Sequence, residues 1–182
     1  MNLTTKQLTS LIAAAVVAVL TVAWMWLGAT TILHGRTVIG PNELKALDPG
    51  NEGINIVVSQ PWFNDSVLVF NIGKPSKNRD FDRLDATRCL LQCAQSLENH
   101  DYKRLYLAND WKRMYYINSD DVKSLGQRYR NGDTWNNALL YVELSKSVHT
   151  LNDSIAFKHD DGLMRAINNL GNWNTMMGNL MR

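Results

Sequence analysis

The sequence is short of cysteine and proline and has almost no excess charge of either sign. Two cysteines cannot build a disulfide scaffold or a four-ligand zinc site by themselves. With 11 glycines and 4 prolines, the chain is neither collagen-like nor of the low-complexity disordered class. The 19 basic residues are nearly balanced by 17 acidic ones, which argues against a nucleic-acid-binding protein. A chain of 182 residues with this composition is long enough for one folded domain.

Short motifs that would identify an enzyme are also missing. The sequence has no Gly-x-Gly-x-x-Gly or Gly-Lys-Ser/Thr phosphate loop, no Gly-x-Ser-x-Gly elbow and no Ser-x-x-Lys pair. Its four histidines are scattered without metal-binding spacing: His34, His100, His149 and His159. We therefore expect no metal and no cofactor, we single out no catalytic residue, and the sequence does not indicate an enzyme.

One long apolar run stands apart from the rest of the chain. Residues 8–33 contain no charged side chain, and Leu11–Leu27 is almost wholly apolar. About 20 helical residues cross the hydrocarbon core of a bilayer. Trp24 and Trp26 lie near one end, where amphipathic rings prefer the headgroup level. The sequence predicts a transmembrane helix over residues 8–33, with the lipid bilayer as its partner.

A cleaved signal peptide is the alternative interpretation of this run, because Lys6 precedes it. The run is long for such a peptide, and Leu27 lies where a small residue is expected before the cut. We expect an uncleaved signal-anchor. The short tail of residues 1–7 favours a cytoplasmic N-terminus and an extracytoplasmic domain, which in a bacterium is periplasmic at the cell inner membrane.

The chain beyond this run is charge-balanced. Without Lys6 and Arg36, which flank the run, 17 basic and 17 acidic residues remain, so residues 37–182 are formally neutral. Electrostatic capture of nucleic acid or of an anionic membrane surface is therefore not expected. A segment of this length can bury a core of its own.

Residues 34–53 are predicted to be a juxtamembrane linker with one helical turn, because Gly40-Pro41 and Asp48-Pro49-Gly50 interrupt regular structure. Residues 54–182 are predicted to form an extracytoplasmic α+β domain. Its strands are expected in β-branched and aromatic runs, and its clearest helix where Ala86, Leu90 and Leu97 recur at helical spacing. In chain order the expected elements are strands 54–59 and 66–72, helix 80–98, strands 104–108 and 111–117, and a helix that begins at Ser119.

This ββαββα order is typical of a compact, mainly antiparallel sheet with helices packed on one face. In the last third, residues 135–151 favour a helix, although 138–144 could be a buried strand. Residues 162–182 form an amphipathic stripe that predicts a C-terminal helix, with Gly171 and Gly178 as points where it could divide in two.

Cys89 and Cys93 lie four residues apart on the predicted helix 80–98. They could form an intrahelical disulfide in an oxidising compartment, although the helix would have to distort. The alternative is that both are small buried apolar residues.

Two groups of large apolar residues are candidates for a partner surface, with folding into the core as the alternative for each. The first is the predicted loop Pro61, Trp62 and Phe63, which could also dip into a bilayer. The second is the C-terminal stripe: Leu163, Ile167, Leu170, Trp173, Met177 and Leu180.

These features predict a single-pass membrane-anchored interaction protein, an accessory or assembly subunit of a membrane or envelope complex. Its partners would be other membrane or envelope proteins or a second copy of the chain, and not nucleic acid. The alternatives are a membrane-tethered small-ligand or lipid-binding domain, which needs a concave apolar pocket, and a membrane-tethered hydrolase, which needs titratable groups with perturbed pKa values in a cleft.

Overall fold

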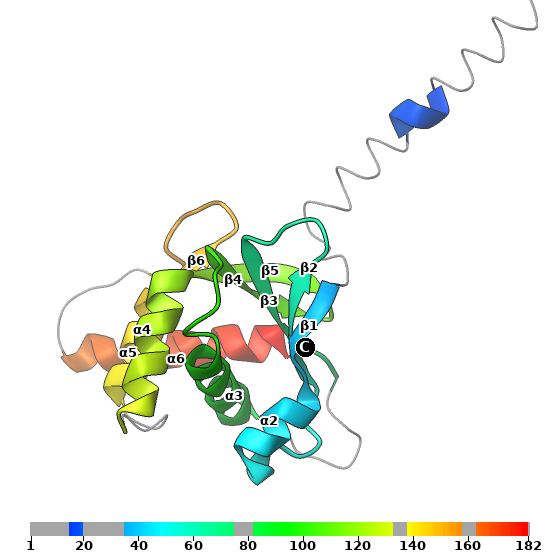
Figure 1. Cartoon of the computed structure of the whole chain (residues 1–182). Coiled ribbons are helices and arrows are strands. Elements are labelled where there is room, and N and C mark those ends of the chain that lie inside the picture. Colours follow the sequence, from blue (N-terminus) through cyan, green and yellow to red (C-terminus); the bar gives the residue numbers. More distant parts are fainter. Residues whose placement is uncertain (1–14, 20–34, 75–81, 133–137, 158–162, 182) are drawn as a thin grey trace, which may run out of the picture.

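Six short runs rich in β-branched and aromatic residues form one sheet in the computed structural model, which describes residues 15–19, 35–74, 82–132, 138–157 and 163–181 (Figure 1). Residues 15–19 are helical. From residue 35 on, the elements are β1 (Gly35–Ile39), α2 (Pro41–Leu47), the 3-10 turn η1 (Pro49–Asn51), β2 (Ile56–Pro61), β3 (Val67–Ile72), α3 (Arg83–Ser96), β4 (Arg104–Asn109), β5 (Lys112–Asn118), α4 (Ser119–Arg130), α5 (Ala138–Lys146), β6 (Val148–Thr150) and α6 (Leu163–Leu180).

The strands lie in the sheet in their order along the chain, β1 to β6. Neighbouring strands are antiparallel except β3 and β4, which are parallel. A parallel pair needs a crossover connection, and α3 lies in the connection between these two strands. Helix α3 starts where the side chain of Asp82 accepts a hydrogen bond from the backbone N–H of Asp85 at 2.8 Å.

The helices pack against one face of the sheet, and Figure 1 shows α3 to α6 grouped on that side. One continuous apolar core joins them to alternate residues of the strands. Fully buried members include Phe70 of β3, Leu107 of β4 and Trp173 of α6. We call this side of the sheet the covered face.

A buried polar network fixes the N-terminal segment to α3. Asn51 donates from Nδ2 to the carbonyl of Leu44 at 2.8 Å and to Oε1 of Gln92 at 2.7 Å, and its Oδ1 accepts from Nη2 of Arg88 at 3.0 Å. Gln92 in turn donates to Asp48 at 3.3 Å. Since buried polar groups are costly unless they are paired, this network holds α2 and η1 in one position.

The α+β class is confirmed, but the predicted architecture needs correction. Four of the five strand pairs are antiparallel, in line with a mainly antiparallel sheet, but β3 and β4 are parallel neighbours, so the sheet is mixed. The expected linker 34–53 contains β1, which pairs with β2 and so belongs to the domain. The expected helix 135–151 ends at Lys146, and Val148–Thr150 forms β6 against β5. In the C-terminal segment α6 continues through Gly171 and Gly178 as one helix.

The transmembrane helix expected as the first element is also corrected. Within the described residues, no helix is long and apolar enough to cross a membrane. Apart from residues 15–19, the span 8–33 lies outside the residues that the structure describes. The anchored topology and the extracytoplasmic location therefore stay predictions from the sequence.

Candidate functional site

The face of the sheet opposite the helices is lined by aromatic and cationic side chains. In the part of the chain that the structure describes, the small apolar cluster on this side, Val69 and Ala108 with Tyr106 and Trp111 against them, contains no helix residue. We call this side the open face. Strand pairing places Val69, Tyr106, Tyr116 and His149 in one row across β3 to β6. Alternation along β4 adds Arg104 to the same face.

The centre of the open face is the ring of Tyr116. The guanidinium carbon of Arg104 lies 4.3 Å from the ring centroid, within range of a cation–π interaction. Asp153 joins both residues: its Oδ1 accepts from the Tyr116 hydroxyl at 2.9 Å and lies 3.2 Å from Nη2 of Arg104. Burial, and then the hydrogen bond to Asp153, raise the pKa of Tyr116. This phenol therefore stays neutral at neutral pH.

His149 completes the cluster from β6. Its ring stacks on Tyr116 with centroids 4.9 Å apart, and its Nε2 lies 3.3 Å from Nδ2 of Asn118. The Nδ1 atom of His149 is buried and has no hydrogen-bond partner in the described part of the chain. Burial raises the pKa of Asp121 at the start of α4, an effect that nearby His149 opposes.

A second stack lies beside the first. The ring centroids of Tyr106 and Tyr116 are 5.9 Å apart in a tilted arrangement, and the guanidinium carbon of Arg113 lies 4.9 Å from the Tyr106 centroid. Both tyrosine rings are thus capped by arginine, and Tyr116 is only 3% exposed. The Arg104 side chain is 38% exposed, so part of it faces solvent beside the covered Tyr116 ring.

The β4–β5 turn brings Trp111 onto the same face in an unusual conformation. Asp110 and Trp111 have positive φ values of 44° and 67°, which suits a two-residue hairpin turn but is rare for a bulky side chain. The Trp111 N–H donates to Oδ1 of buried Asn71 at 2.6 Å, which holds the turn against β3. Strained residues of this kind concentrate at functional sites.

The cysteine pair predicted as a possible disulfide lies in the core. Both residues are fully buried and neither forms a disulfide. The Cys89 thiol donates to Oδ1 of Asn51 at 3.5 Å. Burial, reinforced by Cys89, raises the pKa of the Cys93 thiol well above its ordinary value. Both thiols are therefore packed in the core, as the alternative interpretation expected.

The C-terminal stripe predicted as a partner surface is corrected at three positions. Trp173, Met177 and Leu180 are buried in the core, and the Trp173 indole N–H donates to Oγ1 of Thr87 at 3.0 Å. Leu170 is half-buried against the same core. The side chains of the remaining two, Leu163 and Ile167, lie outside the described residues.

The predicted loop Pro61–Phe63 lies at the turn between β2 and β3. Trp62 is 65% exposed and Phe63 87%, so neither folds back on the sheet. The loop lies beside β1, where Gly35 pairs with Pro61.

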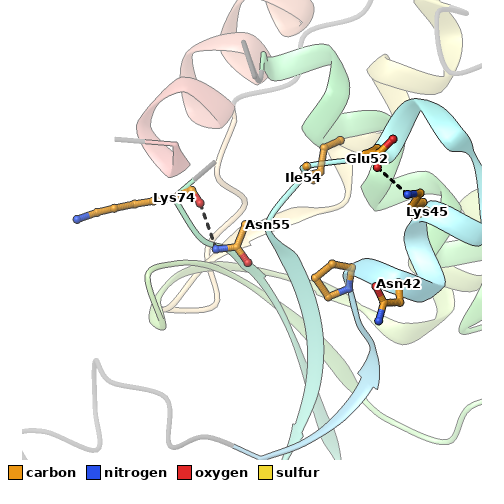
Figure 2. A pocket seen from close by; sticks show the side chains of 8 residues that line it. Asn42, Lys45, Glu52, Ile54, Asn55 and Lys74 are labelled. Atoms are coloured by element: carbon orange, nitrogen blue, oxygen red, sulfur yellow. Dashed lines mark hydrogen bonds and ion pairs between the residues drawn. The ribbon is translucent and has the colours of Figure 1, made fainter. Parts of the chain in front are cut away.

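Two open surface pockets of about 400 Å³ each occur within the described residues. The first lies between the start of α2 and the segment before β2. Figure 2 shows its Lys45–Glu52 ion pair, its hydrogen bond from Asn55 to the Lys74 carbonyl, and the Lys74 side chain directed away from the other residues. Its lining is mostly polar: Pro41, Asn42, Lys45, Glu52, Gly53, Ile54, Asn55 and Lys74. The second is lined by Arg36, Gln60, Pro61, Trp62 and Asp65.

Neither pocket has the properties of a catalytic cleft. No residue with a shifted pKa lines either one. Across the described ranges there is also no group of three or more histidine, cysteine or acidic side chains that could hold a metal ion. On the open face, by contrast, the described residues bring arginine, tyrosine, histidine and aspartate side chains into contact.

The sequence interpretation missed this face, although a signal for it is present. Arg104, Tyr106 and Ala108 alternate with buried leucines in one strand, and Tyr116 and Asn118 alternate with Ile117 in the next. What alternation cannot supply is the pairing that brings His149 and Asp153 to them.

Comparison with known proteins found no matching family model, no matching curated protein and no matching solved structure.

Proposed function

We propose that the protein is a non-catalytic interaction subunit, an accessory or assembly component of a larger membrane or envelope complex, and that it binds a protein partner through the open face. The observation that carries this proposal is the double stack of Arg104 on Tyr116 and Arg113 on Tyr106, on a face whose apolar cluster contains no helix residue in the described part of the chain. Tyrosine, tryptophan and arginine are the residue types that dominate binding energy at protein interfaces.

The stacks favour a protein over single-stranded nucleic acid as the partner. Nucleic-acid bases need free aromatic faces on which to stack. The Tyr116 ring is instead covered by Arg104 and His149, and the chain after Arg36 is formally neutral. An acidic or carbonyl-rich peptide surface would be recognised by the guanidinium groups of Arg104 and Arg113.

Photocrosslinking from the open face tests this proposal. A benzophenone amino acid replaces Tyr106 in the full chain, expressed in its native cells, and the matched control carries it at Tyr129, a half-buried tyrosine of α4 on the other side of the sheet. We expect a discrete heteromeric adduct from position 106 that Arg104→Ala removes, and none from position 129.

Three results would contradict the proposal. Equal crosslinking from both positions would mean that the open face is not selective, and no adduct from position 106 would mean that it is unoccupied. Binding of a labelled single-stranded oligonucleotide at physiological salt, detected by fluorescence anisotropy and lost in Arg104→Ala, would assign the face to nucleic acid instead.

A further inference from the structure

Trp62 and Phe63 are the one place in the described domain where two large exposed aromatic side chains are adjacent. The other large apolar residues exposed from residue 35 on occur singly: Leu47, Leu84, Leu151 and Ile155. Scattered exposed apolar residues are normal, whereas an adjacent pair marks a contact surface. Tryptophan in particular favours the interface between lipid and water.

The loop that carries this pair is held by its own hydrogen bonds. Gln60 donates from Nε2 to the carbonyl of Asp65 at 3.0 Å, and Oδ1 of Asn64 accepts from the backbone N–H of Ser66 at 3.1 Å. The backbone N–H of Asn64 donates to the Pro61 carbonyl at 3.3 Å. The outward position of the aromatic pair is therefore built into the turn.

The chain enters the domain beside this loop. Gly35 is the register partner of Pro61, and a Cβ at Gly35 would lie 1.8 Å from the Gln60 carbonyl oxygen, so the two backbones touch. Seven residues separate Gly35 from Leu27, the last residue of the apolar run. Fully extended, the eight Cα–Cα steps from Leu27 to Gly35 span at most about 29 Å. The loop therefore lies within about 29 Å of the end of the apolar run, a distance at which it can reach a bilayer that the run enters.

Charge around the loop is balanced. The second pocket is lined by one base, Arg36, and one acid, Asp65, and the Arg36 guanidinium donates to Oε1 of Gln60 at 3.0 Å. A contact built on two aromatic rings with no net charge depends on apolar burial and not on anionic headgroups.

We propose that Trp62 and Phe63 insert into the interfacial layer of a lipid bilayer and fix the orientation of the domain on the membrane. This contact is independent of the open face. It requires only that the apolar run associates with lipid.

A depth measurement on the full chain tests this proposal. The parent cysteines are fully buried, so a cysteine introduced by Phe63→Cys can be labelled selectively with an environment-sensitive fluorophore. The control is Leu47→Cys, which replaces an apolar residue that is 50% exposed at the end of α2, beyond the opposite end of β1 (Figure 1). Both proteins are reconstituted into phosphatidylcholine vesicles.

We expect the label at position 63 to shift its emission to the blue and to be quenched by brominated lipid, with little change when anionic lipid is added. The label at position 47 should keep the spectrum it has in water. A water-like spectrum at position 63 in vesicle-bound protein would overturn the proposal, and so would failure of the full chain to float with vesicles. Neither of these two results would change the crosslinking expected from Tyr106 on the open face.

Discussion

The two faces of the sheet differ in chemistry although they share every strand. On the covered face, Phe70, Leu105 and Leu107 are aliphatic or aromatic residues in a continuous core. On the open face, the alternate positions of β4 carry Arg104 and Tyr106. These two side chains are held by cation–π contacts and an ion pair. Burial of apolar area accounts for the stability of the first face. The ion pair and arginine contacts of the open face contribute little to folding stability. This is expected of a surface whose role is to bind a partner.

The largest expected effect separates two neighbours on β4. Leu107→Ala removes a fully buried side chain and should lower the free energy of unfolding by about 2–5 kcal/mol. Tyr106→Ala on the open face should lower it by less than half as much, because the ring is only half-buried. Urea denaturation of both variants measures this. Equal losses would mean that the open face is a packed core face like the other.

In the helices of the covered face, replacing glycine by alanine should have opposite effects on stability at two positions. A Cβ at Gly126 of α4 would lie 2.5 Å from the Ala94 carbonyl oxygen of α3, so Gly126→Ala should destabilise by about 1–3 kcal/mol. Gly171 of α6 has no atom within 4 Å of the same position, so Gly171→Ala should stabilise by up to about 1 kcal/mol. Thermal melts compare the two. A stabilising Gly126→Ala would contradict the close α3–α4 packing.

Alkaline pH should affect the covered face through Tyr141. Burial raises the pKa of Tyr141 to about 12, and its hydroxyl has no hydrogen-bond partner among the described residues. The folded protein keeps this proton while the unfolded chain loses it near pH 10, so its contribution to stability is full below pH 10 and is lost as pH rises towards 12. In Tyr141→Phe the free energy of unfolding, measured by urea denaturation, should fall less between pH 9 and pH 11 than in the parent, by an amount on the order of 1 kcal/mol.

Identical pH profiles for parent and Tyr141→Phe would show that Tyr141 is accessible to solvent.

Tyr116→Phe is the corresponding substitution on the open face. It removes the hydrogen bond to Asp153, so it should lower the urea midpoint at neutral pH, where Tyr141→Phe leaves the midpoint nearly unchanged.

The sequence predicted the elements whose patterns are local. The apolar spacing of Ala86, Leu90 and Leu97 predicted α3, and short runs of β-branched, leucine and aromatic residues predicted β2 to β5. It missed β1, in which Arg36 and Thr37 are exposed and no apolar run marks a strand. It also missed β6, three residues whose extended form depends on pairing with Tyr115, Tyr116 and Ile117.

The candidate site was harder to predict than the fold for the same reason. Alternation in β4 and β5 identifies which residues avoid the core, but not what they meet. His149 and Asp153 reach Tyr116 only through the β5–β6 register. Trp173 and Met177 show the opposite case. Their residue types made them candidates for a partner surface, but the packing of α6 buries both in the core.

The smallest change in stability is expected for Arg104→Ala, the substitution that tests whether the open face binds a partner. Arg128 serves as the control for Arg104, because their side chains are 29% and 38% exposed and both form an ion pair, with Glu143 and Asp153 respectively. Arg104→Ala and Arg128→Ala should each change the free energy of unfolding by less than about 1 kcal/mol.

The most direct measurement is the affinity of these two variants for the protein captured by the Tyr106 crosslink, by titration with the full chain. Arg104→Ala should weaken binding about tenfold or more, as loss of an interfacial arginine does, and Arg128→Ala should bind like the parent. Equal affinities for both variants, with folding intact, would contradict the assignment of the open face as the binding surface.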